Sequence, residues 1–431
     1  MALKFLAGLA AVATGAQAGA TAHRLAARAG SLARSFAQPE AESWARADRF
    51  VVAASVFVML LLLARSLPGD VFGAFMLAYT ALFLFMNLQK ALVAEPHRAL
   101  GARLPESERR RHTGSMAVMQ GVGGLALCAL LCVAGGVAAA FYSPRAGDVL
   151  VALAISAVPW LSQDFLRRAL HARGRSRDAA INSVVTQGLQ LFGTVVLCAT
   201  AADWATPVSA LSVLALSAMV GAIVGMWQLQ PLVDFSRTGE AHYRRAWSDA
   251  LHHGRELAAP NGLGWLTAQG PSWIVALLLG VEALGIYRAV AHPAHAGDPF
   301  LELGRGAGRW MTVLLYAIAP FIAVLVVFPV PALEAVYGDK FAIAGVASIL
   351  VLAAAAQGLG YARIPLADGV KALRAEHPLL GSVLPPALTL ILVTLLVSFF
   401  GVIGAPLAMV VVNLAFLAAA WSAQQKVLSE R

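Results

Sequence analysis

The chain has 431 residues, of which 59% are hydrophobic and 13% are charged, and its mean hydropathy is +0.73. Soluble domains carry about 25% charged residues, so this composition excludes a soluble globular protein. The formal net charge of +9 does not indicate a nucleic-acid-binding protein, because the basic residues are concentrated in loops between apolar segments.

Apolar residues form eleven long segments, most of them near the roughly 20 residues that a helix needs to cross a bilayer. The runs are continuous rather than alternating, which favours membrane helices over a β-barrel. In chain order they are Phe50–Ala64, Phe72–Ala94, Gly114–Phe141, Val149–Leu166, Ile181–Thr200, Pro207–Leu229, Gly262–Gly280, Trp310–Val330, Phe341–Tyr361, Gly381–Phe400 and Val402–Trp421. The predicted fold class is all-α, a polytopic bundle of membrane helices.

Basic residues alternate between rich and poor loops. The rich loops are 95–113, 167–180, 230–260 and 362–380. Lys and Arg are enriched in cytoplasmic loops, so we predict that these four loops are cytoplasmic. The N-terminal residues before the first segment are also basic and are predicted to lie on the same side.

Residues 1–20 allow two interpretations. Lys4, an apolar stretch and the run Ala16-Gln17-Ala18 are typical of a signal peptide. Cleavage would place the basic residues that follow outside and invert every later loop, which the charge pattern opposes. We therefore favour a cytoplasmic lead helix whose basic residues could touch anionic lipid.

No clean apolar run lies between Gly280 and Trp310, yet the charge pattern requires a crossing there. Without one, the 362–380 loop would lie outside in spite of its basic residues. We therefore predict a twelfth, atypical span at about Leu284–Leu303, with both chain ends cytoplasmic. Charges at mid-bilayer cost about 2.5–3.5 kcal/mol each. Three interpretations stay open: a polar helix lining a water-filled cavity, a broken or re-entrant segment shielded by neighbours, and a helix shortened by a deletion.

Neither a metal site nor an enzyme is predicted. His292, His295 and Asp298 have i, i+3 spacing, but nothing nearby completes a metal site. The three cysteines fall inside apolar segments and are interpreted as packing residues. The sequence has no metalloprotease, phosphate-loop or nucleophile-elbow motif. We expect no cofactor.

Two stretches on the predicted outer side are alike. Residues 67–75 and 279–287 each contain an acid, two further residues and then Gly-x-aromatic, at an offset of 212 residues. A glycine at this place suits a tight turn or a close helix approach. Equal orientation implies two parallel six-span halves. The predicted domains are a cytoplasmic N-terminal segment (1–48), a first half (49–230), a cytoplasmic linker (231–260), a second half (261–422) and a cytoplasmic tail (423–431).

Four stretches carry a family resemblance, namely residues 64–73, 285–289, 336–341 and 401–405. In these the chain resembles the polysaccharide (lipid-linked oligosaccharide) flippases of the multidrug/oligosaccharidyl-lipid/polysaccharide exporter superfamily. The resemblance covers about residues 45–425. It implies two six-helix halves around a central cavity, a pattern from which the eighth span departs.

Polar residues inside spans are candidate binding residues, because they usually face the interior of a bundle. Asn261, Trp265, Gln269 and Trp273 repeat at i, i+4 on the seventh span, although a kink at Pro271 could move Trp273 off this face. Aromatic rings can stack on a sugar while amides bond its hydroxyl groups. A second stripe, on the fifth span, contains Ser183, Gln187, Gln190 and Thr194. Helix packing through amide bonds is the alternative for both stripes.

Only two of the 32 Lys and Arg residues, Lys90 and Arg288, fall within predicted spans. A cation in the cavity could hold the diphosphate of a lipid-linked sugar. Asn87 lies one turn from Lys90 and joins it as a candidate. Both cations lie near span ends, so snorkelling to the interface is the alternative.

Together these features predict a flippase that moves a polyprenyl-diphosphate-linked oligosaccharide across the cell inner membrane for surface polysaccharide production. One alternative is a multidrug/cation antiporter, which would require a buried mid-membrane acid in the first half; Asp164 lies only near a cytoplasmic span end. Another is a non-transporting membrane scaffold. The expected partners are lipid-linked oligosaccharide and membrane lipids, with a polysaccharide polymerase and glycosyltransferases as further candidates and no nucleic acid.

Overall fold

The computed structural model describes residues 39–200, 204–235, 239–304, 309–341, 344–366 and 384–429. Most of the predicted N-terminal segment and most of the 362–380 loop lie outside these residues. All regular structure in the described ranges is helical, which confirms the all-α class.

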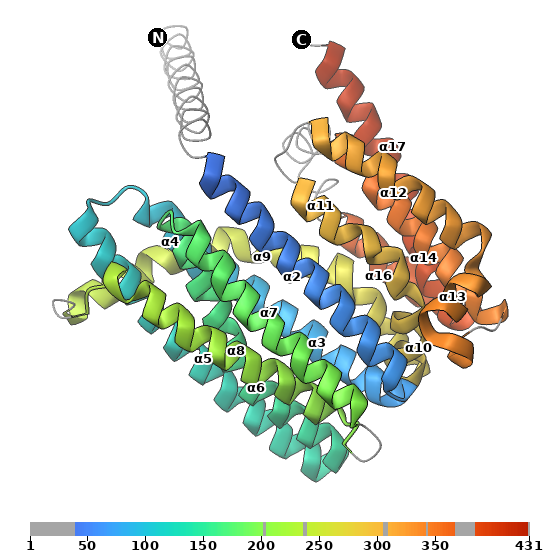
Figure 1. Cartoon of the computed structure of the whole chain (residues 1–431), viewed down its shortest axis with the longest axis horizontal. Helices are drawn as coiled ribbons and strands as arrows, with labels where there is room; N and C mark the ends of the chain where they lie inside the picture. Colours follow the sequence, from blue (N-terminus) through green and yellow to red (C-terminus); the bar gives the residue numbers. More distant parts are fainter. Residues whose placement is uncertain are drawn as a thin grey trace, which may run out of the picture.

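The described residues form a bundle of twelve long helical segments (Figure 1). They are α2 (Pro39–Ser66), α3 (Gly69–Gln89), α5 (Glu106–Phe141), α6 (Pro144–Ala172), α7 (Ser176–Ala199), α8 (Pro207–Leu229), α9 (Glu240–Leu279), the series α10 (Val281–Ala291), η3 (His292–Gly297) and α11 (Asp298–Gly304), α12 (Arg309–Val327), α14 (Ala344–Ala362), α16 (Leu384–Phe400) and α17 (Gly404–Ser429). Short elements join them: η1 (Lys90–Ala94), α4 (Glu95–Gly101), η2 (Gln230–Leu232), α13 (Pro329–Tyr337), η4 (Gly338–Lys340), η5 (Ile364–Leu366) and η7 (Gly401–Ile403).

Length and hydropathy mark nine helices of the described residues as able to cross a membrane, and the pair α12–α13, bent by 99°, makes a tenth candidate. One of the nine, Pro385–Gln425, combines α16 and α17. These two helices pack against each other and meet at Gly401, whose φ of 61° suits a glycine. They therefore correspond to the two separate spans that the sequence predicts there.

The predicted eighth span exists as a broken segment between residues 281 and 304. It runs antiparallel to α2, since His292 bonds the carbonyl of Phe57 at 2.8 Å and the ring of Phe300 lies 5.9 Å from that of Phe50. The segment thus follows most of the length of a candidate span. Its two prolines interrupt the helix because they cannot donate a backbone hydrogen bond. The deletion interpretation is wrong, and the segment is a broken one shielded by its neighbours rather than a continuous polar helix.

Two predicted loops are largely helical. The 95–113 loop contains α4 and the start of α5, and the 230–260 loop contains the first half of α9. Ion pairs spaced by three or four residues, such as Glu95–Arg98 and Glu240–Arg244, support these helices outside the apolar segments. Hydropathy alone ends a segment where the helix leaves the apolar region, so it underestimates helix length.

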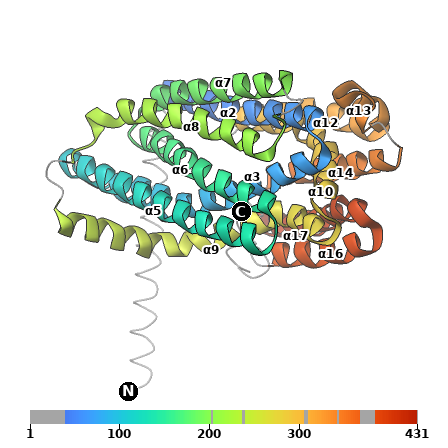
Figure 2. The same cartoon turned by 90° about the horizontal axis from the view of Figure 1, so that it is seen from below.

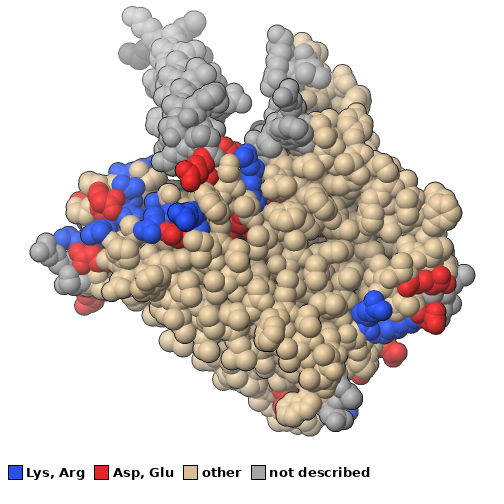
Figure 3. Space-filling model, in the orientation of Figure 1, with Lys and Arg blue, Asp and Glu red and all other residues tan. Residues whose placement is uncertain are grey.

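Charged side chains lie at two opposite ends of the molecule, with a broad uncharged band between them (Figure 3). The larger basic group lies near the start of α2 (Figure 3), and α17 ends at the same end of the molecule (Figure 1). An even number of crossings places the two ends of a chain in this way. The separation of charge from a band of apolar surface is that of a multi-pass membrane protein.

The two repeated stretches cross each other in space. A Cβ added at Gly73 would lie 1.9 Å from the carbonyl oxygen of Val281, and one added at Gly285 would lie 1.9 Å from that of Gly69. Gly73 and Gly285 are equivalent positions at the offset of 212 residues, and so are Gly69 and Val281. Each repeat therefore presents the same two positions to the other. The predicted close approach at a glycine is therefore present, between α3 and α10.

Helix α9 packs against helices of both predicted halves. Its first half buries Ala246 and Ala250 in a cluster with Phe165 and Leu170 of α6, and it runs beside α5 (Figure 2). Its second half packs against α10 and α16. The predicted division into halves, with a boundary in this helix, stays a prediction.

Candidate functional site

One face of α3 carries most of the predicted binding residues or their contacts. Asn87 of α3 and Asn261, Trp265 and Gln269 of α9 line one cavity of about 220 Å³, together with Phe83. Four candidates from two spans, predicted separately, are thus brought together. A cavity of this size is smaller than the roughly 300–1,000 Å³ of pockets for drug-sized ligands, so it fits about one sugar ring.

The amide groups of the cavity are unevenly satisfied. Asn87 donates its Nδ2 to the carbonyl of Phe83 and Asn261 donates its own to that of Leu257, each at 2.8 Å. The Oε1 of Gln269 is buried without a hydrogen-bond partner among the described residues. The amide donors of the two asparagines are therefore bound within their own helices, and the Oε1 of Gln269 remains as an acceptor. Such a cavity suits groups that donate, such as sugar hydroxyls.

Two tryptophans of α9 converge on a single residue of α3. Trp265 donates its indole N–H to the carbonyl of Thr80 at 2.9 Å, and Trp273 donates to the hydroxyl of Thr80 at 3.0 Å. Their ring centroids lie 6.1 Å apart with the planes at 59°. Pro271 therefore does not separate Trp273 from Trp265, although Trp273 lies outside the lining of the cavity.

Arg288 lies on α10, partly buried, and no hydrogen bond or ion pair joins it to another described residue. Its electrostatic neighbours are Tyr79 and Tyr287. The hydroxyl of Tyr79 is buried and has no hydrogen-bond partner in the described part of the chain. The guanidinium and this hydroxyl are both donors, so together they could hold an anion.

Lys90 begins a π-helical turn, η1, at the end of α3. Pro96 follows this turn, and a proline removes a hydrogen bond and crowds the carbonyl four residues earlier, which is a common cause of such irregular turns. The side chain is partly buried. Lys90 and Tyr79, the neighbour of Arg288, are eleven positions apart, so about 16 Å of helix separates these two residues.

Gln187 and Gln190 lie on α7, which packs against α2 rather than on the cavity. Gln190 is fully buried and donates to the sulfur of Met59 at 2.9 Å. Both glutamines have an Oε1 without a hydrogen-bond partner among the described residues. Their contacts are those of helix packing, and their role in substrate binding stays a prediction.

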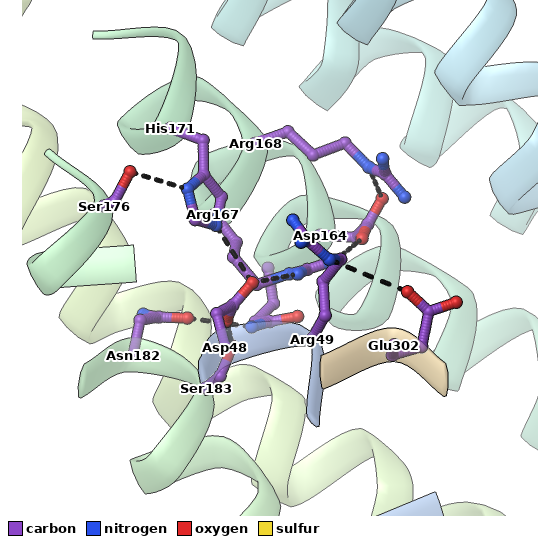
Figure 4. Close-up of polar contacts among 11 residues, drawn as sticks. Asp48, Arg49, Asp164, Arg167, Arg168, His171, Ser176, Asn182, Ser183 and Glu302 are labelled. Carbon is purple, nitrogen blue, oxygen red and sulfur yellow. Dashed lines mark hydrogen bonds and ion pairs between the residues drawn. The ribbon is translucent and has the colours of Figure 1, made fainter. Parts of the chain in front are cut away.

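A buried ionic network that the sequence did not indicate joins the ends of α2, α6 and α7 (Figure 4). Arg167 donates to Asp48 at 2.7 Å and to Asp164 at 2.8 Å, and Arg168 donates to Asp164 at 2.6 Å. The Asp48 side chain is 1% exposed and also bonds His171 and Ser183. Two carboxylates thus face two guanidiniums, and the charges balance.

Hydropathy did not reveal this network, because the apolar segments begin at Phe50 and end at Leu166. Asp48, Arg167 and Arg168 therefore lie one or two residues beyond them, and only Asp164 lies inside a segment. The spacing of Asp164, Arg167 and Arg168 at i, i+3 and i+4 was the available signal. Outside the balanced core, Arg49 of α2 lies 3.7 Å from Glu302 of α11 (Figure 4).

A second polar group surrounds the break in the eighth span. Asp298 accepts hydrogen bonds from Tyr361 at 2.6 Å and Gln357 at 3.0 Å and lies 3.0 Å from His295. His292 is instead bonded to α2. Within the described ranges no group of three or more His, Cys, Asp and Glu residues could hold a metal ion.

The sequence from residue 50 to residue 301, more than half of the chain, matches the family model described as polysaccharide biosynthesis protein. The chain belongs to this polysaccharide biosynthesis family. The resemblance seen in the sequence is thereby confirmed. No curated protein sequence matches the chain significantly.

Solved transporters share the fold of this polysaccharide biosynthesis protein. A MATE transporter in its straight conformation superposes with a TM-score of 0.63 at 14% identity, over 90% of this chain and 96% of the other. An outward-facing multidrug resistance MATE family transporter of the MOP superfamily gives 0.60 at 13%, over 90% and 96%. A MOP superfamily transporter from Pyrococcus furiosus gives 0.59 at 11%, over 90% and 95%. At these identities the likeness establishes the fold alone: the chain has the fold of these transporters.

Proposed function

We propose that the protein moves a polyprenyl-diphosphate-linked oligosaccharide across the cell inner membrane for surface polysaccharide production, with both termini cytoplasmic. The observation that carries the proposal is the cavity between α3 and α9 of this member of the polysaccharide biosynthesis family. It is lined by Trp265, by two asparagines and by Gln269, whose Oε1 has no hydrogen-bond partner among the described residues. Aromatic faces pack on the C–H side of a sugar and acceptors bind its hydroxyls.

The diphosphate has its own candidate partners at two depths along α3. Arg288 and the hydroxyl of Tyr79 lie on the outer side of the cavity, and Lys90 lies on its inner side. Tyr79, the neighbour of Arg288, and Lys90 lie about 16 Å apart along α3, which is too far for one diphosphate to bridge. The two cations therefore serve successive positions of the substrate rather than one site. A diphosphate that moves from Lys90 to Arg288 would therefore be paired with a positive charge at the start and at the end of this step.

The buried carboxylates weigh against organic-cation transport. A cation antiporter needs an available buried acid in its first half. Asp164 lies there and Asp48 lies at its border, but each already bonds Arg167. An organic cation would have to displace a guanidinium held at 2.7–2.8 Å. Among the described residues no buried carboxylate of this region is free of a guanidinium, which weighs against the alternative of a multidrug/cation antiporter.

Proteoliposomes test the proposal directly. Polyprenyl-diphosphate-linked glycan with a fluorescent group on the sugar is placed in the membrane, and an impermeant quencher reports transfer between leaflets. We expect transfer faster than in protein-free liposomes, slowed by R288Q and K90Q and not by R244Q, whose arginine lies in an exposed ion pair. Uptake of an organic dye with no glycan transfer would support the antiporter instead. No transfer of either, or unchanged surface polysaccharide in a strain lacking the protein, would contradict the flippase and leave a scaffold.

A further inference from the structure

Thr80 connects the sugar cavity to the contact between two helices. It lies on α3 and is 1% exposed. Its hydroxyl donates to the carbonyl of Leu77 at 2.9 Å and accepts from Trp273, while its own carbonyl accepts from Trp265. One residue therefore satisfies the single polar group of two large side chains, which belong to a helix 185 and 193 residues further along the chain.

This arrangement determines what Trp265 can offer a ligand. The indole has one N–H donor and no acceptor. Because that donor is bound to Thr80, Trp265 presents only its ring to the cavity, where Gln269 supplies an acceptor. The ring is also restrained, because Trp273 lies 6.1 Å away, tilted by 59°, and is bound to the same threonine.

We propose that Thr80 is a positioning residue that holds the ring of Trp265 as a stacking surface for one sugar unit. Thr80 touches no ligand itself, since it is absent from the lining of the cavity. The stacking surface exists only while α9 is in contact with α3, so sugar binding favours the state in which these helices are packed together. The assignment rests on the proposed function for the identity of the ligand, but the contact is testable without transport.

Three variants separate the contact from general stability. T80V removes the hydroxyl at nearly constant volume and leaves Trp273 without its acceptor. T80S keeps the hydroxyl and should rescue. T194V is the matched control, because Thr194 is equally buried but its hydroxyl bonds only the carbonyl of Gln190 in its own helix. All variants are full-length protein in lipid nanodiscs.

The first measurement is spectroscopic. Indole N–H signals of the nine tryptophans are recorded by NMR, with W265F and W273F as assignments. We expect T80V to shift the Trp273 signal and to broaden or shift that of Trp265, with T80S and T194V like wild type. N-acetylglucosamine, glucose and galactose are then titrated, and we expect at least one to perturb Trp265 in wild type and about fivefold more to be needed in T80V.

The second measurement is KM for the lipid-linked glycan in proteoliposomes. We expect T80V to raise KM about fivefold with little change in kcat, and T80S to restore it. Indole signals that do not change in T80V would overturn the assignment. So would changed signals with unchanged sugar titration and KM, because Thr80 would then be a packing contact alone. If no sugar perturbs Trp265 in wild type, the stacking surface is refuted, while glycan transfer still decides the proposed function separately.

Discussion

Replacing Gly73 with alanine should separate α3 from α10 at the end of the molecule that the proposed topology places outside, called here the outer end. The added Cβ would lie 1.9 Å from the carbonyl oxygen of Val281, whereas ordinary contact begins at 3.4 Å. Helices α3 and α10 must therefore separate by about 1.5 Å at their crossing. Overpacking of this kind costs about 1–3 kcal/mol. That energy is lost only in the state in which the crossing is closed, so the closed state should be depopulated about 5–150-fold relative to an open one.

Double electron–electron resonance measures this shift. Spin labels replace Arg145 and Glu334, two exposed residues near the outer end in opposite predicted halves, after the three native cysteines are changed to serine. We expect G73A to add a population at longer distance. Glycan transfer should fall, because a transporter held open on one side cannot complete its cycle.

Gly69 provides the matched control on the same helix. A Cβ added there meets the flexible Glu282 side chain at 3.4 Å, which is ordinary contact, so G69A should leave the distances as in wild type. G285A should act like G73A, since its Cβ would also lie 1.9 Å from a carbonyl oxygen. Identical distance distributions in G73A and G69A would refute the view that the glycine crossing closes the outer end.

Three further changes test other contacts. R167Q removes the cation shared by two buried carboxylates and should lower stability by about 3–5 kcal/mol, seen as a lower Tm in detergent; R244Q, in an exposed pair, is the control, and equal Tm values would count against the network. K340M removes donors to three carbonyls at the end of α2. It should raise the population at the longer Arg145–Glu334 label distance about fivefold; an unchanged distribution would show that Lys340 does not hold the outer end closed. G121A adds a Cβ into open space and should raise Tm slightly, because alanine favours helix by about 1 kcal/mol, so a lowered Tm would mean that this face is packed.

Much of the architecture could be predicted because a bilayer imposes simple rules on sequence. Continuous apolar runs located the helices, and the alternation of basic loops required an eighth crossing where hydropathy showed none. A close helix approach at Gly73 and at Gly285 could also be predicted, since the repeat places a glycine at equivalent positions of both stretches. Even so, the sequence did not reveal that these two residues cross each other, because an offset in the chain says nothing about the angle between helices.

The candidate site was predicted less completely. The i, i+4 spacing on α9 located Asn261, Trp265 and Gln269 correctly on a common face, because helical periodicity is local. Thr80 escaped notice, since its role depends on a contact between α3 and α9 that no local pattern encodes. The α7 stripe shows the opposite difficulty: a buried face packed on a neighbouring helix carries the same amides as a face that lines a cavity.

Helix α9 has a mechanical consequence for how such a molecule can move. Its first half is anchored deep against α6, and Gly254 lets it approach the carbonyl of Ala91 so closely that an added Cβ would lie 2.7 Å away. Its second half is packed on α16. A rigid rod fixed at both ends would couple any rocking of one end to the other. Pro260 and Pro271 interrupt the backbone hydrogen bonds between these anchors, so bending concentrates there. Trp265 lies between these two prolines, so bending of α9 at either one changes the shape of the cavity between α3 and α9.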